Sequence, residues 1–197
     1  MNPLLLRIIE ILLPIFAIVA VGFFYGRKHR PEMAVANRIN LDVFLPALVF
    51  STLAGKSYAL KEDGLLALAA LLAILLPGLL AWPVARLIGV SPRTFVPPMM
   101  FNNSGNIGLP VALLAWGEGA VPVAVVFFLV VNLLHFSLGA RMLDRQAKLL
   151  GLWRIPVLAA ALAGLAVGLL QWTLWPPVMM AIKLLGDISI PLVLFAL

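Results

Sequence analysis

The residues best suited to chemistry lie in one short stretch, Pro97–Pro110, which reads PPMMFNNSGNIGLP between apolar flanks. Gly105 and Gly108 lower its helix propensity, and Pro110 has no backbone N–H to donate. In lipid, an amide group without a partner costs several kcal/mol, so we expect the stretch to be shielded by protein or to line a wet cavity. Four polar side chains stand in its middle: Asn102, Asn103, Ser104 and Asn106.

This composition predicts two half-helices joined by an unwound turn. The second half-helix, beginning near Leu109 or Pro110, would point its positive end and its free N–H groups into the middle of the membrane, where an anion binds well. Unwound carbonyls and asparagine oxygens would suit a cation. A polar loop outside the membrane, between two short helices, is the alternative interpretation.

Two carboxylates, Asp42 and Asp187, lie in or beside apolar segments. A charge in hydrocarbon is costly, so a carboxylate there indicates support of a substrate site or coupling to an ion. The alternative is that both lie near the headgroups and cap helix starts.

Asn132 and His135 are three residues apart and so share one face of a helix. They suit substrate binding or a proton relay, because imidazole titrates near neutral pH. A hydrogen bond between helices is the simpler explanation. The chain has no cysteine, and its two histidines do not form an H-E-x-x-H pattern, so we expect no metal site and no cofactor.

These residues must be positioned by helices in a membrane. The 197 residues are 63% hydrophobic and 11% charged, whereas soluble domains carry about 25% charged residues. The sequence therefore predicts an all-α polytopic membrane protein whose main partner is the lipid bilayer. The net charge of +6 is not taken as a sign of nucleic-acid binding, because the basic residues lie between apolar spans.

About seven transmembrane segments follow from the length of helix, roughly 20 residues, that crosses the hydrocarbon. The fourth is the broken one, at about 95–116. The predicted spans are Leu4–Tyr25, Ala36–Leu53, Gly64–Ala85, Phe95–Trp116, Val121–Met142, Ile155–Trp175 and Met179–Leu197.

The basic residues predict the topology. Ten of the fourteen Lys and Arg fall on one side of the predicted spans, and four on the other. The positive-inside rule then places the N-terminus outside and the basic loops in the cytoplasm. If the fourth segment re-entered instead of crossing, the basic cluster between Arg141 and Arg154 would lie outside. The four basic residues on the side with fewer Lys and Arg are Arg7, Lys56, Lys61 and Lys183.

Two pairs of segments repeat in order. Span one carries Pro14 and Gly22 eight residues apart, and span six carries Pro156 and Gly164 at the same spacing. A D-x3-P-x3-F frame occurs at Asp42–Phe50, with Pro46, and again at Asp187–Phe195, with Pro191. Because five spans separate the copies, the second enters the membrane from the opposite side, which is typical of secondary transporters.

A stripe of small residues, Ala160, Gly164 and Gly168, permits close contact between helices. We expect it to pack inside the bundle, and a homodimer seam is the alternative.

The run Asn103–Pro110, together with the L-P-A-L-x-F core at Leu45–Phe50 and the I-P-L-x-L-F run at Ile190–Phe195, resembles the auxin efflux carrier family, which includes plant carriers and bacterial permeases. The resemblance spans essentially the whole chain. It implies a fold of two inverted five-helix repeats, similar to that of bile acid–sodium symporters, in which broken helices cross at the substrate site.

By this resemblance, residues 1–142 form the first repeat, 143–154 a cytoplasmic basic connection, and 155–197 the start of the second, incomplete repeat. Asn103 and Pro110 would mark the crossover, with Asn106 and Gly108 beside it. The resemblance also implies a bacterial inner-membrane carrier of small organic anions, either auxin-like compounds or dicarboxylates such as malate and malonate. H⁺ or Na⁺ is the coupling ion to be considered.

Two other functions are kept as alternatives. The chain resembles a fragment without its last helices, so it is also compatible with a helical subunit that does not transport by itself and is completed by another chain. A pair of intramembrane aspartates would suit an aspartyl protease, but the G-x-G-D pattern of such enzymes is missing.

Overall fold

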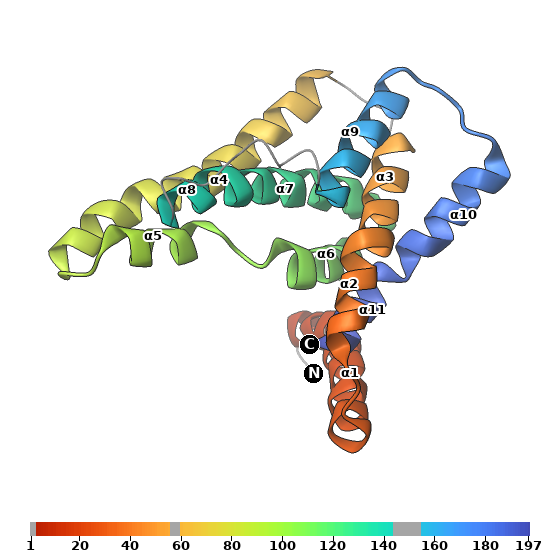
Figure 1. The fold of residues 1–197 in the computed structure, drawn as a ribbon, viewed down its shortest axis with the longest axis horizontal. Helices are drawn as coiled ribbons and strands as arrows, with labels where there is room; N and C mark the ends of the chain where they lie inside the picture. The colour runs from red at the N-terminus through yellow and green to blue at the C-terminus, as the bar shows by residue number, and fades with distance from the viewer. Residues whose placement is uncertain (1–2, 56–59, 144–154) are drawn as a thin grey trace.

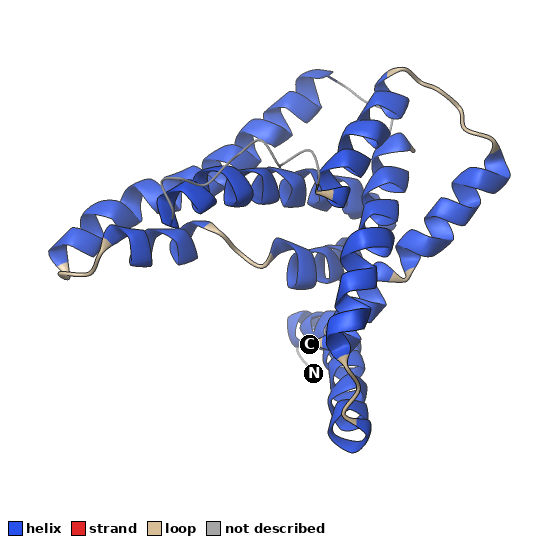
Figure 2. Ribbon diagram, viewed as in Figure 1, coloured by secondary structure: helices blue, strands red, loops and turns tan. Residues whose placement is uncertain are grey.

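The computed structural model describes residues 3–55, 60–143 and 155–197, and every regular element in these ranges is helical (Figure 2). This confirms the predicted all-α class. The predicted basic connection lies, apart from residue 143, outside the described residues. The α-helices are α1 (Pro3–His29), α2 (Met33–Ile39), α3 (Leu45–Ala54), α4 (Leu60–Leu87), α5 (Pro92–Met100), α6 (Leu109–Trp116), α7 (Val121–Leu134), α8 (Ala140–Leu143), α9 (Pro156–Leu169), α10 (Pro176–Asp187) and α11 (Ser189–Ala196).

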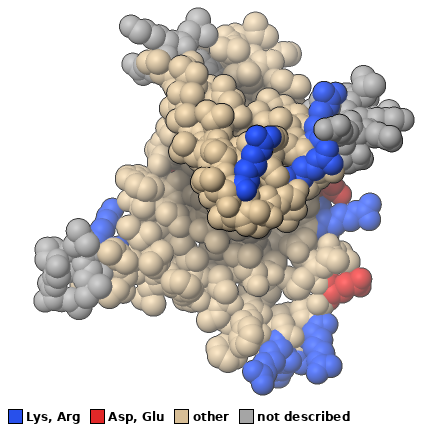
Figure 3. Space-filling view, turned by 90° about the vertical axis from the view of Figure 1, so that its left-hand side faces the viewer, with Lys and Arg blue, Asp and Glu red and all other residues tan. Residues whose placement is uncertain are grey.

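Five helical stretches of the described residues are long and apolar enough to cross a membrane: Leu6–His29, Met33–Ala54, Gly64–Leu87, Glu118–Leu143 and Pro176–Ala196. The broken pair α5–α6 and the shorter α9 supply the other two predicted segments. Most of the face in Figure 3 carries neither acidic nor basic side chains, and the charged ones stand in a few separate groups. The chain is therefore a multi-pass membrane protein.

The sixth predicted span, Ile155–Trp175, is too long. Helix α9 ends at Leu169, and Gln171 has a φ of +50°, which a continuing helix does not permit. Trp175 is extended because it precedes Pro176, and the ring of a proline disfavours helical geometry in the residue before it. Hydropathy alone does not reveal where this helix ends, because the segment that follows Leu169 is itself partly apolar.

The helices form two groups, which meet where α7 contacts α3 and α9 (Figure 1). The central group consists of α4 to α8, from the middle of the chain, where α4 packs on α5 and α7. The terminal group consists of α1 to α3 and α9 to α11, from the two ends of the chain, where α3 packs on α9 and α10, and α1 packs on α11. An apolar cluster joins the groups, with Leu45 and Leu48 on one side and Leu109, Val125 and Phe128 on the other.

Two glycine contacts hold the terminal group together. A Cβ atom at Gly164 of α9 would lie 2.8 Å from the carbonyl oxygen of Phe50 in α3 and 3.1 Å from its Cα. A Cβ atom at Gly22 of α1 would overlap the carbonyl oxygen of Phe195 in α11 and lie 3.1 Å from its Cα. The sequence repeat pairs the two glycines with each other and the two phenylalanines with each other, so the contacts are equivalent under that repeat. Gly164, in the small-residue stripe, thus packs within the chain.

Candidate functional site

The fourth segment is broken at the predicted place. Helix α5 ends at Met100, Phe101 is extended, and a π-helical turn at Ser104–Gly108 leads into α6. The side chain of Asn103 caps this turn, since its Oδ1 accepts a hydrogen bond from the backbone N–H of Asn106 at 3.1 Å.

The π geometry of this turn has a cause in the sequence. Pro110 has no N–H to give to the carbonyl of Asn106, so a regular α-helical hydrogen-bond ladder cannot run through this stretch. The backbone N–H groups shift to partners five residues back, and the N–H of Gly108 donates to the carbonyl of Asn103 at 3.1 Å.

Two further π-helical turns, Asn40–Phe44 and His135–Gly139, complete the set of three in the described part of the chain. The first directly precedes α3, whose second residue, Pro46, also lacks an N–H. Residues from all three turns line one cavity. π-helical geometry occurs in well under 1% of residues in proteins and is frequent at functional sites. Its concentration around one cavity therefore marks the site.

This cavity, here called the polar cavity, has a volume of about 560 Å³ and lies between the terminal and central groups. No lysine or arginine is among the lining residues that the structure describes. Its polar lining residues are Asn40, Asp42, Asn102, Asn103, Ser104, Asn106, Asn132, His135 and Ser189, and apolar side chains such as Leu45, Phe128 and Val193 complete the wall.

A second cavity, here called the apolar cavity, has a volume of about 800 Å³ and lies along α6 and the start of α7. Asn102, Asn103 and Ser104 line both cavities. The unwound turn thus stands between two cavities of different character. The remaining residues of the apolar cavity are Ile107, Gly108, Val111, Ala112, Trp116, Gly119, Ala120, Val123, Ala124 and Phe127.

The structure brings most of the predicted site residues to these cavities. Gly105 also lines the polar cavity, and an added Cβ there would lie 2.9 Å from Cε2 of Phe128, so glycine permits the close approach of the turn to α7. Four predicted residues line neither cavity: Pro46, Pro110, Asp187 and Pro191. Pro46 and Pro110 stand at the second residues of α3 and α6, where they accompany the π-helical turns.

The two aspartates have different surroundings. Asp42 lies inside the continuous helical stretch that begins at Met33, so it does not cap a helix start. It lines the polar cavity and its Oδ2 lies 3.7 Å from Nε of Arg38. Asp187 is the last residue of α10 and is exposed. The two carboxylates therefore do not share a cavity as a catalytic dyad would.

Asn132 and His135 lie on the same wall, but the expected hydrogen bond between helices is not the one that forms. Nδ2 of Asn132 donates to the carbonyl of Phe128 in its own helix at 2.8 Å. The imidazole of His135 stacks on the ring of Phe101, with centroids 4.7 Å apart, at the point where α5 ends. His135 thus packs against the residue at which the fourth segment is interrupted.

Sequence reasoning missed Asn40 and Ser189, the two polar residues of the described chain that are buried in the core. Asn40 is 3% exposed, and among the described residues no donor bonds to its Oδ1. A polar residue in the second span was a signal that could have found it. Ser189 lies between Asp187 and Pro191 of the repeated frame. The first copy has a phenylalanine at this position, so the repeat does not single out Ser189.

The electrostatics at the turn favour an anion. The first N–H groups of a helical run have no partner inside that run, and here they belong to Ser104 and Gly105, which line the polar cavity. The dipole of the run from Ser104 to Trp116 adds a partial positive charge at the same point. Asparagine amide groups supply further donors.

The comparisons with known proteins give one match. Residues 7–151 of the 197 match a family described as membrane transport protein. No curated protein and no solved structure matches the chain. The matched range includes the broken segment and both cavities' central-group walls.

Proposed function

The chain belongs to the membrane transport protein family, the auxin efflux carrier family, and we propose that it is a secondary transporter of small organic anions that works by alternating access. One observation carries the proposal. The unwound turn at Asn102, Asn103 and Ser104 lines two cavities, so a ligand held there has a path on either side. Alternating access requires a fixed site at a broken helix with a route to each side of the membrane.

The helix groups provide the moving parts. The polar cavity is walled by the terminal group on one side and by the central group on the other. A rocking of one group against the other would close this cavity, while the apolar cavity, whose described lining lies within the central group, would remain as the route on the other side of the turn. The equivalent glycine contacts of α1 with α11 and of α3 with α9 support an inverted repeat in the terminal group.

The lining of the polar cavity supports a small organic anion as the substrate. No described lining residue of the polar cavity is basic, so we assign charge compensation to the helix start at Ser104 and Gly105 and to amide donors. Such a site holds one carboxylate loosely enough to release it. The apolar wall, which includes Phe128 and Val193, suits the carbon skeleton of an auxin-like compound or a small dicarboxylate.

Asp42 is the proposed coupling residue. It is the carboxylate that lines the polar cavity, and carboxylates on a substrate path carry the proton in proton-coupled transporters. Among the described residues, Arg38 and His135 are the other titratable or charged groups beside it. In vesicles, uptake by the wild type should rise with an inward proton gradient, and uptake by Asp42→Asn should not respond to it. A Na⁺ requirement without a proton effect would contradict this assignment.

In the proposed topology the N-terminus is outside and the basic loops are in the cytoplasm of a bacterial cell. With each predicted span crossing once, Trp116 at the end of α6 is outside, so the apolar cavity opens outward and the polar cavity inward. The hydrogen bond from Arg7 near the N-terminus to Ala115 agrees with this arrangement, because it joins two segments that the topology puts on the same side.

The test is uptake of labelled organic anions by membranes that contain the protein. Asn103→Ala removes both the amide in the cavities and the cap of the turn, and we expect it to abolish uptake while membrane insertion stays normal. Asn103→Asp, which keeps the capping oxygen, controls for loss of the turn itself. Undiminished uptake by Asn103→Ala would contradict the site. Uptake only after a second polypeptide is added would support the non-transporting subunit.

A further inference from the structure

Asn40 is a buried polar residue whose side-chain oxygen has no partner in the described part of the chain. It begins the π-helical turn Asn40–Phe44, which contacts α9, α10 and α11. Asn40 is 3% exposed, and no described donor bonds to its Oδ1. Most buried polar groups in proteins are hydrogen-bonded, so this oxygen requires an explanation.

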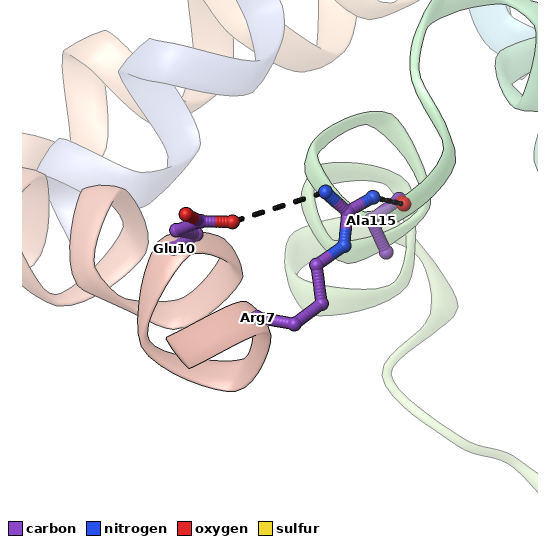
Figure 4. A network of polar contacts seen from close by, with 3 residues as sticks. All are labelled: Arg7, Glu10 and Ala115. Carbon is purple, nitrogen blue, oxygen red and sulfur yellow. Dashed lines mark hydrogen bonds and ion pairs between the residues drawn. The ribbon is translucent and has the colours of Figure 1, made fainter. Parts of the chain in front are cut away.

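Another polar side chain between the two helix groups does have partners within the protein. Nη2 of Arg7 in α1 donates a hydrogen bond to the backbone carbonyl of Ala115 in α6 at 2.9 Å, and its Nη1 lies 3.9 Å from Oε2 of Glu10 (Figure 4). All the atoms of these contacts belong to the chain, so they need no ligand. Asn40 differs, because it lines the polar cavity and a ligand in that cavity lies beside it.

Ser189 is the second buried polar residue of the described chain, and it lies on the same wall. It is the first residue of α11, is 1% exposed and lines the polar cavity. Helix α11 contacts both the turn that begins at Asn40 and the turn Ser104–Gly108. A serine hydroxyl accepts hydrogen bonds as well as donating one. Asn40 and Ser189 therefore give the terminal-group wall neutral acceptors beside the turn to which the carboxylate site is assigned.

The missing donor matters most when the cavity is occupied. Water in an empty polar cavity satisfies an acceptor, but a substrate that fills the cavity displaces this water. A substrate with a donor group restores the hydrogen bond, whereas a substrate without one leaves the oxygen buried and unpaired. For this reason, sites built to bond a hydroxyl or an N–H group strongly reject analogues that lack it.

We propose that Asn40, assisted by Ser189, is a specificity-determining residue that accepts a hydrogen bond from a hydroxyl or ring N–H group of the substrate. The inference rests on the proposed transport function and narrows its substrates. The substrate is an organic anion with two recognised groups: a carboxylate at the helix start of Ser104 and Gly105, and a neutral donor at Asn40. Malate and indole-3-acetate carry such a donor, whereas succinate and malonate do not.

The experiment compares the uptake of matched acids by membrane vesicles that contain the protein. Malate and succinate differ by one hydroxyl group, and indole-3-acetate differs from its N-methyl derivative by the ring N–H. In the wild type, we expect the donor-bearing acid of the transported pair to be taken up about tenfold faster than its analogue, as loss of one buried hydrogen bond predicts. Asn40→Leu should bring the two rates together, by slowing the donor-bearing acid and not its analogue.

The ratio of the two rates is an internal control for folding, because a variant that is less abundant in the membrane takes up both acids more slowly. Asn37→Leu changes an exposed asparagine one turn earlier and should keep the wild-type ratio. Ser189→Ala should lower the ratio less than Asn40→Leu does. It also supplies a second test if Asn40→Leu does not reach the membrane.

The outcomes separate this inference from the transport function. Equal uptake of the two acids of a pair by the wild type, or an unchanged ratio in Asn40→Leu, would overturn the inference and leave the transport function standing. A Na⁺ requirement that Asn40→Leu abolishes, without any preference between the acids, would assign the oxygen to a cation and also overturn it. If the wild type takes up none of these acids, the proposed function itself is wrong.

Discussion

The helix–helix contacts within the terminal group are more closely packed than the boundary between the two groups. Within the group, α1 meets α11 and α9 meets α3 through backbone atoms, at glycines that leave no room for a Cβ. At the boundary lie a cavity of about 560 Å³ and the buried amide oxygen of Asn40, which has no donor among the described residues. Close backbone packing resists movement, whereas incomplete packing and unpaired polar groups allow two arrangements of similar energy. The difference supports the proposed movement at the boundary beside a more rigid terminal group.

The largest effect should come from adding a methyl group at one of the glycine contacts within the terminal group. Gly22→Ala puts a methyl group into the carbonyl of Phe195, and we expect it to destabilise the folded protein by about 1–3 kcal/mol, as overpacking does. Gly26→Ala is the matched control, one turn along the same helix with nothing within 4 Å of the added Cβ. Thermal unfolding in detergent measures both. Equal melting temperatures for the two variants would show that this contact is not close-packed.

A smaller effect should come from the boundary, and it should separate stability from function. Asn40→Leu removes the buried oxygen that has no donor among the described residues, so stability should stay the same or rise, because an unpaired buried polar group is costly. Uptake should fall about tenfold if the amide serves the site. Asn37→Leu, an exposed asparagine one turn earlier, should leave both unchanged. Lower stability with normal uptake would make Asn40 a structural residue.

The glycines of the turn offer a finer comparison within the boundary. Gly105→Ala places a Cβ 2.9 Å from Cε2 of Phe128, whereas a Cβ at Gly108 has its nearest neighbour at 3.6 Å. Uptake should therefore drop several-fold in Gly105→Ala and hardly change in Gly108→Ala. Trimming the ring by Phe128→Leu should restore part of the loss. A greater loss at position 108 would show that the turn is not held against α7.

The smallest effect should come from the exposed ion pair. Arg38 and Asp42 are 3.7 Å apart with side chains 86% and 53% exposed, so Arg38→Gln should alter the free energy of unfolding by less than about 1 kcal/mol. Unfolding in denaturant measures this. A greater loss of stability would mean that the ion pair contributes to the packing of the terminal group and does not belong to the boundary between the groups.

Much of this arrangement follows from local sequence. Long apolar runs predict the spans, because backbone groups in lipid must be paired within a helix. The break at Asn103 is predictable because asparagine, glycine and proline each disfavour a continuous helix. The cap of Asn106 by Asn103 follows from the same residues, since asparagine is a favoured helix cap.

Other features depend on tertiary packing and were not predicted. The repeat contains Gly22 and Phe195, but which helices meet there depends on the assembled bundle. The early end of α9 depends on Gln171 and on Pro176, which hydropathy does not weigh. Asn40 lies in an apolar helix, and only the fold shows that its oxygen is buried with no donor in the described part of the chain. The inverted repeat beyond these contacts stays a prediction.

The most direct test of the central claim is the accessibility of Ser104, which lines both cavities. Ser104→Cys in this cysteine-free chain is treated with a membrane-impermeant thiol reagent in right-side-out and in inverted vesicles. We predict modification from both sides and protection from both by a transported anion. A cysteine that reacts from neither side, or from one side only under all conditions, would contradict alternating access at the unwound turn.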